Sequence, residues 1–293
     1  MTPSDTYSEI LNLRLPQGAR EKLVFIDKNN IANTLIANKG NIFLAPWGED
    51  ARRAGEGLCI FFFMLIKVCG MRDPQNIAEV SKLGIDMMGF IFWPKSPRYV
   101  SQISSRAGII PDRVNTEMLD GKQSDVKYVG VFVDDMPQNI VTRVYNFKLD
   151  YVQLHGDESP VMIDNLKATL IPDIAPDIKI IKALSIREAD DVKRWREYEG
   201  HADMLLFDTK CKCVGGSGEQ FDWSVLEGYD GNIPFLLSGG IGPDDVERVK
   251  AFKHPMCVGI DLNSKFEIEP GLKDVEKVRA FVSLTKPSQR EGC

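Results

Sequence analysis

The sequence is poor in the residues that build disulfide frameworks and metal centres. Its 293 residues include six cysteines and three histidines. Six cysteines are too few for a disulfide scaffold in a chain of this length. Cys211 and Cys213 lie close together, but no second cysteine pair accompanies them, as a zinc site would require. These scarcities predict a reduced, cytoplasmic protein without a metal site.

Long apolar runs and an excess of basic charge are also absent. The longest apolar run, 58–66, has about nine residues, whereas a helix needs about 20 to cross a bilayer. The N-terminal segment lacks the basic and then apolar order of a secretory signal. Lysine and arginine number 36 against 42 acidic residues, a net charge of −6. The composition therefore gives no reason to expect nucleic acid or a membrane as a partner, and it leaves room for a small anionic ligand.

What the sequence does contain is a regular alternation from Met64 onward. Short runs rich in Val, Ile and Phe are typical of buried parallel strands, and longer amphipathic runs are typical of helices. The expected strands are 65–69, 87–92, 128–133, 151–155, 178–184, 204–208, 234–239 and 257–262. The expected helices are 74–83, 137–147, 160–169, 185–198, 243–253 and 273–284. The segments after the second and sixth strands are expected to be loops with at most a short helix.

Eight strands with helical connections over roughly 230 residues match a (β/α)₈ TIM barrel in count and size. An open doubly wound sheet is the alternative, but it usually has fewer strands, and no GxGxxG follows the first strand here. We therefore predict one barrel domain over 64–293. Residues 1–63 contain one strand-like run, 23–26, and a polar remainder. They are expected to be an N-terminal extension that is poorly packed or lies outside the natural start.

Polar residues stand where the expected strands end, which is where barrels of this kind hold their active sites. By residue type alone, Cys69 is a small core residue, half of a disulfide, a metal ligand, or a nucleophile or base beside a site. The other strand-end residues are Asp134, His155, Asp208, Ser238 and Asp261, with Arg98 just beyond the second strand. We expect Asp134 to be structural.

The turns after the last two strands favour a phosphate ligand. Gly239 and Gly240 follow the seventh strand, and Asn263 and Ser264 follow the eighth. Such turns offer backbone N–H groups to phosphate in many barrels. An ordinary strand-to-helix turn is the alternative for the glycines. Lys265 lies close enough to add positive charge.

Seven motifs together resemble the phosphoribosylanthranilate isomerase family of tryptophan biosynthesis, in order from about 64 to about 282. They are KVCGM (67–71), GFIFWPKSPRYV (89–100), GVFVDD (130–135), VQLHGDE (152–158), LLFDTK (205–210), GGSGEQFDW (215–223) and LSGGIGPDDV (237–246). The resemblance does not cover residues 1–63.

This resemblance implies an Amadori rearrangement of N-(5-phosphoribosyl)anthranilate by general acid–base catalysis, without a metal or organic cofactor. It implies that Cys69 is the general base, Asp208 the general acid and Arg98 the ligand of the anthranilate carboxylate. Together with the strand-end and turn positions above, it gives a set of candidate substrate-binding residues: Arg98, His155, Gly239, Gly240, Asp261, Asn263 and Ser264. For Asp261, a buried, hydrogen-bonded strand-end carboxylate is an equal alternative to a substrate contact. We expect a lowered pKa for the Cys69 thiol and a raised pKa for the Asp208 carboxyl. His155 is expected to shape the pocket more than to transfer protons.

One departure from the family pattern follows the eighth strand, where Lys265 replaces a glycine.

The related histidine-pathway isomerase has an acid in place of Cys69, and indole-glycerol-phosphate synthase relies on lysine and glutamate. A non-catalytic phosphate binder on the same barrel would not need Cys69 and Asp208. A monomer or homodimer is expected, with association to neighbouring tryptophan-pathway enzymes as a further possibility. The 215–218 loop is expected to close over the substrate.

Overall fold

The computed structural model describes residues 24–26, 33–38, 41–46, 64–101, 125–209 and 222–286. The chain divides into two compact units, Met1–Phe62 and Phe63–Cys293. Within the described residues, no helix is both long enough and apolar enough to cross a membrane.

The first unit contains a small antiparallel sheet in the order β1-β2-β3. Its strands are β1 (Val24–Ile26), β2 (Asn33–Asn38) and β3 (Asn41–Pro46). The prediction of a single strand in this region was therefore wrong. The apolar runs of β2 and β3 are only a few residues long, so their periodicity gives a weak signal.

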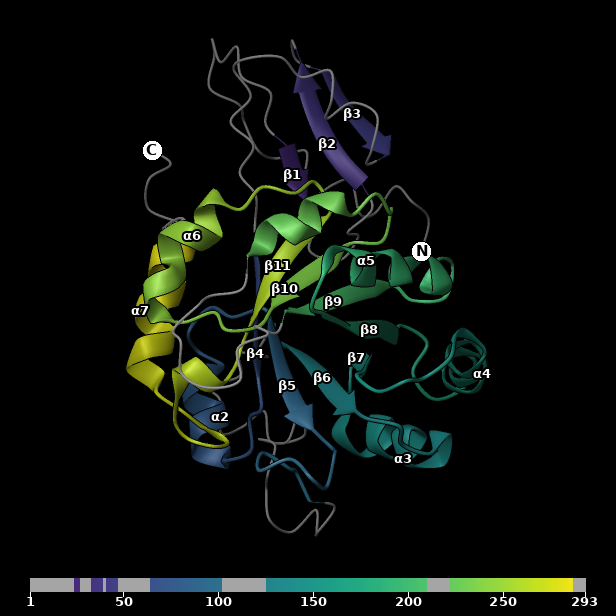
Figure 1. Cartoon of the computed structure of the whole chain (residues 1–293). Coiled ribbons are helices and arrows are strands. Elements are labelled where there is room, and N and C mark those ends of the chain that lie inside the picture. The colour runs from purple at the N-terminus through teal and green to yellow at the C-terminus, as the bar shows by residue number, and fades with distance from the viewer. Residues whose placement is uncertain are drawn as a thin grey trace. The chain divides into compact units, whose positions relative to one another are not determined.

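The second unit is a closed barrel of eight parallel strands, and all eight strands predicted from the sequence are confirmed (Figure 1). The strands are β4 (Leu65–Cys69), β5 (Met87–Ile91), β6 (Lys127–Phe132), β7 (Tyr151–Leu154), β8 (Lys179–Ile186), β9 (Met204–Thr209), β10 (Phe235–Ser238) and β11 (Cys257–Leu262). The ring closes where β11 pairs with β4, with Asp261 opposite Lys67 in the ladder.

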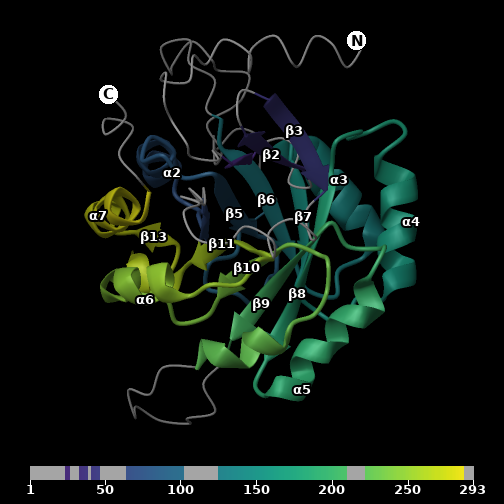
Figure 2. The same ribbon diagram turned by 90° about the horizontal axis from the view of Figure 1, so that it is seen from above.

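Helices surround the barrel, with α2, α6 and α7 on one side and α3, α4 and α5 on the other (Figure 2). The α-helices are α2 (Pro74–Val80), α3 (Pro137–Phe147), α4 (Pro160–Leu170), α5 (Ala189–Val192), α6 (Val246–Ala251) and α7 (Val275–Thr285). The 3₁₀ helices are η2 (Lys193–Tyr198), η3 (Trp223–Gly228), η4 (Pro243–Asp245) and η5 (Ser264–Phe266). A short hairpin, β12 (Glu267–Glu269) and β13 (Leu272–Lys273), precedes α7.

The predicted helix 185–198 begins too early. Strand β8 continues through Ile186, and a short α5 is followed by the 3₁₀ helix η2. Ile186 is fully buried in the hydrophobic core, so packing of the strand decides the conformation at this boundary.

Alternation along each strand sorts the side chains into an outer and an inner set. On β4, Ile66 and Val68 are fully buried in the hydrophobic core between strands and helices. Lys67 and Cys69 alternate with them and face the barrel interior. The outer set therefore stabilises the fold, and the inner set at the carboxyl ends of the strands is left to form a site.

Removing residues 1–63 should leave the barrel intact, because they lie outside its eight strands. We expect a chain beginning at Met64 to be soluble, with the near-UV circular dichroism and thermal midpoint of the full chain. An insoluble or molten product would show that the barrel needs the first unit.

Candidate active site

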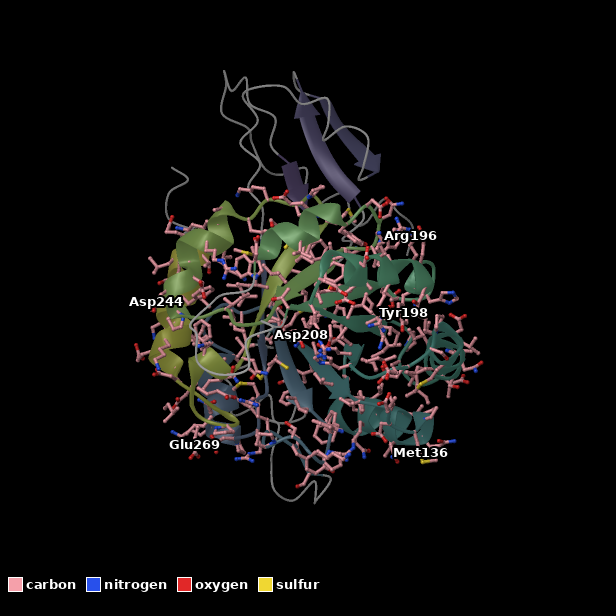
Figure 3. All side chains as sticks on the ribbon, in the orientation of Figure 1. Met136, Arg196, Tyr198, Asp208, Asp244 and Glu269 are labelled. Atoms are coloured by element: carbon pink, nitrogen blue, oxygen red, sulfur yellow. The ribbon has the colours of Figure 1, made fainter. Side chains whose placement is uncertain are left out.

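A cavity of about 320 Å³ opens at the carboxyl end of the barrel. That volume lies at the lower end of the range for small-molecule sites. Its lining includes every predicted site residue except Arg98: Cys69, His155, Asp208, Gly239, Gly240, Asp261, Asn263 and Ser264. Figure 3 shows Asp208 near the centre of the barrel, whereas Asp244 and Glu269 lie at its periphery. Closure of the barrel thus brings together predicted site residues from five of its strands and the turns that follow them.

Cys69 ends β4 and lies on this cavity with a side chain only 3% exposed. Burial raises the pKa of the Cys69 thiol, and the nearby ammonium of Lys67 opposes that effect only in part. The expectation of a lowered thiol pKa was therefore wrong for the free protein. Desolvation of the thiolate outweighs attraction to its cationic neighbours.

Gly70 explains why a glycine follows this cysteine. Its φ is +81°, a conformation that side chains rarely adopt, and a Cβ here would lie 2.6 Å from Cδ of Arg98. The same Cβ would lie 2.9 Å from Oδ1 of Asn263. The glycine therefore lets the stem of Arg98 and the turn after β11 approach the backbone beside Cys69.

A buried ion pair lies beneath Cys69 and joins the first and last strands of the barrel. Lys67 Nζ donates to Asp261 Oδ1 at 2.8 Å, and the Lys67 side chain is fully buried. Ser238 Oγ donates to the other oxygen, Asp261 Oδ2, at 3.1 Å. Burial disfavours the charge on Lys67, but attraction to Asp261 and Cys69 prevails and raises the pKa of Lys67. Asp261 is thus a hydrogen-bonded carboxylate at the floor of the cavity.

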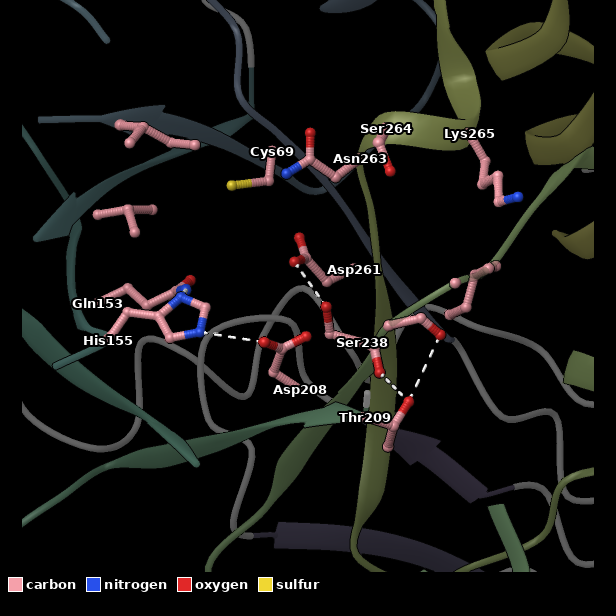
Figure 4. A pocket seen from close by; sticks show the side chains of 15 residues that line it. Cys69, Gln153, His155, Asp208, Thr209, Ser238, Asp261, Asn263, Ser264 and Lys265 are labelled. Atoms are coloured by element: carbon pink, nitrogen blue, oxygen red, sulfur yellow. Dashed lines mark hydrogen bonds and ion pairs between the residues drawn. The ribbon is translucent and has the colours of Figure 1, made fainter. Parts of the chain in front are cut away.

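His155 and Asp208 contact each other across the cavity (Figure 4). Their closest atoms, His155 Nε2 and Asp208 Oδ2, are 3.3 Å apart. The other ring nitrogen, Nδ1, lies 3.5 Å from Nε2 of Gln153. The imidazole is therefore held beside the candidate acid.

The turn after β10 is built around a close approach of two backbones. Gly239 has a φ of +102°, and a Cβ at this position would collide with the carbonyl oxygen of Thr209. Thr209 Oγ1 donates to the carbonyl oxygen of Ser238 at 2.7 Å and fixes the turn from the neighbouring strand. Ser264 and Lys265 lie on the same cavity, away from His155 and Gln153 (Figure 4). The cavity therefore has two different ends: one is lined by the glycine turn and Lys265, and the other holds the imidazole of His155.

Not every N–H group of the glycine segment is available to a ligand. The N–H of Gly242 donates to Asp245 Oδ2 at 2.7 Å and caps the turn that leads into α6. Donors for an anion must therefore come from the earlier part of the turn, at Gly239 and Gly240, and from the turn after β11.

Arg98 does not line the cavity and is already paired. Its Nε donates to Glu267 Oε1 at 2.7 Å, and its Nη2 donates to Glu267 Oε2 at 2.6 Å. Its position against Gly70 nevertheless keeps it beside Cys69. The carboxylate of Glu267 is the partner of Arg98 in this structure.

Comparison with known sequences decides the family. The family model of N-(5′-phosphoribosyl)anthranilate isomerase matches residues 66–284. The N-(5′-phosphoribosyl)anthranilate isomerase of Parabacteroides distasonis is 46% identical over 230 residues, which cover 78% of this chain and 97% of the relative. That of Phocaeicola vulgatus is 41% identical over 223 residues, covering 76% and 98%. The chain belongs to this isomerase family.

A solved phosphoribosylanthranilate isomerase, in complex with reduced 1-(o-carboxyphenylamino)-1-deoxyribulose 5-phosphate, has the same fold. It aligns with a TM-score of 0.60 at 28% identity, covering 76% of this chain and 99% of the other. The enzyme from Thermus thermophilus aligns with a TM-score of 0.59 at 27% identity, covering 75% and 98%. The sequence-based predictions of a TIM barrel and of an isomerase are confirmed.

Several contacts at this isomerase site were not predicted from the sequence. Gln153 of β7 lies on the cavity, and alternation with His155, which directly follows that strand, could have indicated it. Glu267 carries no comparable signal, because its partner Arg98 lies 169 residues away in the chain. Lys273 pairs with Glu267 across a short hairpin that the sequence analysis did not predict. Cys211, Cys213 and the 215–218 loop lie outside the described residues. Asp134 accepts the N–H of Asp157 through Oδ1 at 2.7 Å, which is the structural role expected of it.

The Lys67–Asp261 pair yields a stability prediction. Lys67→Met should lower the free energy of unfolding by roughly 3–5 kcal/mol, because it leaves a buried carboxylate without its cation. Adding Asp261→Asn should recover part of the loss. Urea unfolding measures both, with Lys193→Met, which removes the exposed Lys193–Asp190 pair, as a control expected near the wild-type midpoint. Equal midpoints for Lys67→Met and the control would contradict a buried role for the pair.

Proposed function

We propose that this chain converts N-(5′-phosphoribosyl)anthranilate into 1-(2-carboxyphenylamino)-1-deoxyribulose 5-phosphate, a step of tryptophan biosynthesis, by general acid–base catalysis. The observation that carries the proposal is that Cys69 and Asp208 share one cavity in a chain of the isomerase family. A furanose between them would have an acid and a base within the same small site. The two transfers require a proton donor near the ring oxygen and an acceptor near C2.

Asp208 acts as the acid in this scheme. Its carboxyl proton goes to the furanose ring oxygen, the C1–O bond breaks, and the nitrogen lone pair forms a C=N bond. His155, with Nε2 at 3.3 Å from Asp208 Oδ2, fixes the orientation of the carboxyl. This contact directs the carboxyl toward the substrate without making the imidazole the proton donor.

Cys69 acts as the base. Its thiolate removes the C2 proton, the C–H electrons form the C1–C2 double bond, and the C=N electrons return to nitrogen. The resulting enol tautomerises to the ketone. Because burial raises the pKa of the Cys69 thiol, the thiolate is a minor form at neutral pH in the free enzyme. The ammonium groups of Lys67 and Lys273 favour that form and partly offset the burial.

The turns after β10 and β11 hold the substrate phosphate in this proposal. Gly239, Gly240 and Ser264 offer backbone N–H groups, and Lys265 adds a cation at the same end of the cavity. Asp261 and Asn263 line the floor beneath the sugar. Arg98 binds the anthranilate carboxylate. No metal or organic cofactor takes part, because both proton transfers are assigned to protein side chains.

The remaining predictions concern the protein's surroundings. The phosphoribosylanthranilate isomerase of Thermotoga maritima is dimeric, and monomers of it have been produced. We propose a monomer or homodimer here, a cytoplasmic location, and docking to neighbouring tryptophan-pathway enzymes. Sedimentation of the purified chain measures the first of these directly.

Replacing either proton-transfer residue should abolish most of the turnover. We expect Cys69→Ala and Asp208→Asn each to lower kcat by on the order of 10²–10⁴, with a much smaller change in substrate affinity. Cys69→Asp should recover some activity over alanine, because it restores a base. The assay follows the loss of fluorescence of the anthranilate adduct.

The pH profile of kcat/KM should be bell-shaped, because one carboxyl must be protonated while one thiol is ionised. The Cys69→Ala variant should lose one limb of this profile. A Cys69→Ala enzyme with near-normal kcat would remove the thiol from the mechanism. A wild-type protein that binds the substrate without turning it over would favour a phosphate-ligand binder.

Arg98 should act mainly on substrate binding. Arg98→Ala should cost roughly 2–4 kcal/mol in kcat/KM, because a charge-assisted fork to the carboxylate is lost. Arg98→Lys should recover only part of this, since an ammonium lacks the planar pair of donors. Steady-state kinetics on both variants make the comparison, and an unchanged kcat/KM in the alanine variant would exclude Arg98 from the site.

A further inference from the structure

Glu267 is a buried carboxylate beside the active site that the proposed chemistry does not use. Its side chain is 5% exposed and accepts hydrogen bonds from two cations. Arg98 donates to both of its oxygens at 2.6–2.7 Å, and Lys273 Nζ donates to Oε1 at 2.6 Å. The N–H of Gly271 also reaches Oε1, at 3.2 Å. A buried carboxylate with this many donors is fixed in both position and orientation.

The hairpin that carries Glu267 is itself anchored to the barrel's helical layer. Glu267 on β12 pairs with Lys273 on β13 in the strand register. The backbone of Lys273 makes two hydrogen bonds with the side chain of Asn76 on α2, both at 2.8 Å. Lys273 Nζ also donates to Asn263 Oδ1 at 2.9 Å, which ties the hairpin to the cavity lining. Glu267 is therefore held by a rigid frame.

The fork geometry determines which part of Arg98 remains for a ligand. Arginine has five N–H donors, and the pair with Glu267 uses the Nε–H and one N–H of Nη2. The Nη1 group and the second N–H of Nη2 form the adjacent edge of the same plane. That edge has the spacing that a second carboxylate can grip with two parallel hydrogen bonds.

The charges of the cluster add up to one surplus positive charge. Burial lowers the pKa of Lys273, and the hydrogen bond to Glu267 opposes that effect. With Lys273 protonated, Arg98 and Lys273 contribute two cations and Glu267 one anion. Burial disfavours the charged carboxylate, but the hydrogen bonds from Arg98 and Lys273 prevail and hold the pKa of Glu267 below its usual value. The ionised cluster therefore matches one carboxylate in charge. Without Glu267, two cations would crowd one another beside the Cys69 thiol.

We infer that Glu267 is a positioning residue that selects a carboxylate-bearing substrate, because it fixes the Arg98 fork with one edge open. The inference rests on the proposed function, in which Arg98 binds the anthranilate carboxylate. It adds that the discrimination for a carboxylate depends on a residue that never touches the substrate. The ligand class is an arylamine sugar phosphate with one carboxylate on its ring.

The experiment compares two inhibitors that differ only in that carboxylate. They are the reduced product, 1-(2-carboxyphenylamino)-1-deoxyribitol 5-phosphate, and the same compound with an unsubstituted phenyl ring. The ratio of their inhibition constants measures discrimination for the carboxylate. Glu267→Gln should lower this ratio at least tenfold and raise KM by a similar factor. Binding of the phenyl compound and kcat should stay within about twofold, because the phosphate and proton-transfer groups are untouched.

Glu269→Gln is the matched control, because Glu269 is an exposed residue of the same strand. It should leave the ratio unchanged. In an Arg98→Ala background, Glu267→Gln should cause no further loss of discrimination, since the two residues act as one unit. A loss of affinity for both inhibitors alike would indicate general disruption of the site and overturn the inference, as would an unchanged ratio.

Failure of this inference is distinguishable from failure of the proposed function. If Arg98→Ala loses the discrimination but Glu267→Gln keeps it, Arg98 binds the carboxylate without help and only the positioning role is wrong. If Arg98→Ala keeps the discrimination, the assignment of Arg98 is wrong, and the positioning role falls with it. Should Glu267→Gln not fold, Glu267→Asp serves instead, because its shorter side chain cannot span both donors. A folded Glu267→Asp enzyme with the wild-type ratio would overturn the positioning role.

Discussion

The ion pair between Lys67 and Asp261 is the interaction on which the rest of the site depends. It joins β4 to β11, the first and last strands of the barrel, at the point where the ring closes. Lys67 lies two residues before Cys69 on the same face of β4. Asp261 accepts a hydrogen bond from the hydroxyl of Ser238 on β10. A shift of one residue in the β11–β4 register would turn Asp261 outward and leave Lys67 buried without a partner. The same ion pair therefore fixes the register at which the barrel closes and places a cation next to the Cys69 thiol.

Burial of Cys69 creates a conflict between shielding the reaction and ionising the base. Desolvation raises the pKa of the thiol, so the thiolate is scarce in the free enzyme. The same low polarity strengthens each interaction made by the thiolate that does form. In the active form of the enzyme, the Asp208 carboxyl is protonated and the Cys69 thiol is ionised, so the two groups together hold one proton. A raised thiol pKa thus lowers the population of the active form without removing it.

The sequence predicts features that follow from local patterns, and it does not predict contacts between residues that are far apart in the chain. Strand periodicity predicted all eight barrel strands, and the rule that sites lie at strand ends predicted Cys69, His155, Asp208 and Asp261. The pairing of Arg98 with Glu267 joins positions 169 residues apart, and no local pattern encodes it. The thiol pKa was misjudged for the same reason, because burial is a property of the closed barrel. The start of α5 was missed because core packing extends β8 to Ile186.

Lys265 stands where the family pattern has a glycine, and the backbone conformation at this position explains why the fold accepts a lysine there. A glycine is indispensable only where φ is positive or where another group approaches closely. Among the described non-glycine residues, positive φ occurs at Asp134 and Lys148, so Lys265 adopts a conformation open to any side chain. It lies in the 3₁₀ turn η5 with its side chain on the cavity. The substitution therefore adds a cation at the end assigned to phosphate and leaves the turn unstrained, whereas Gly239 could not be replaced in the same way.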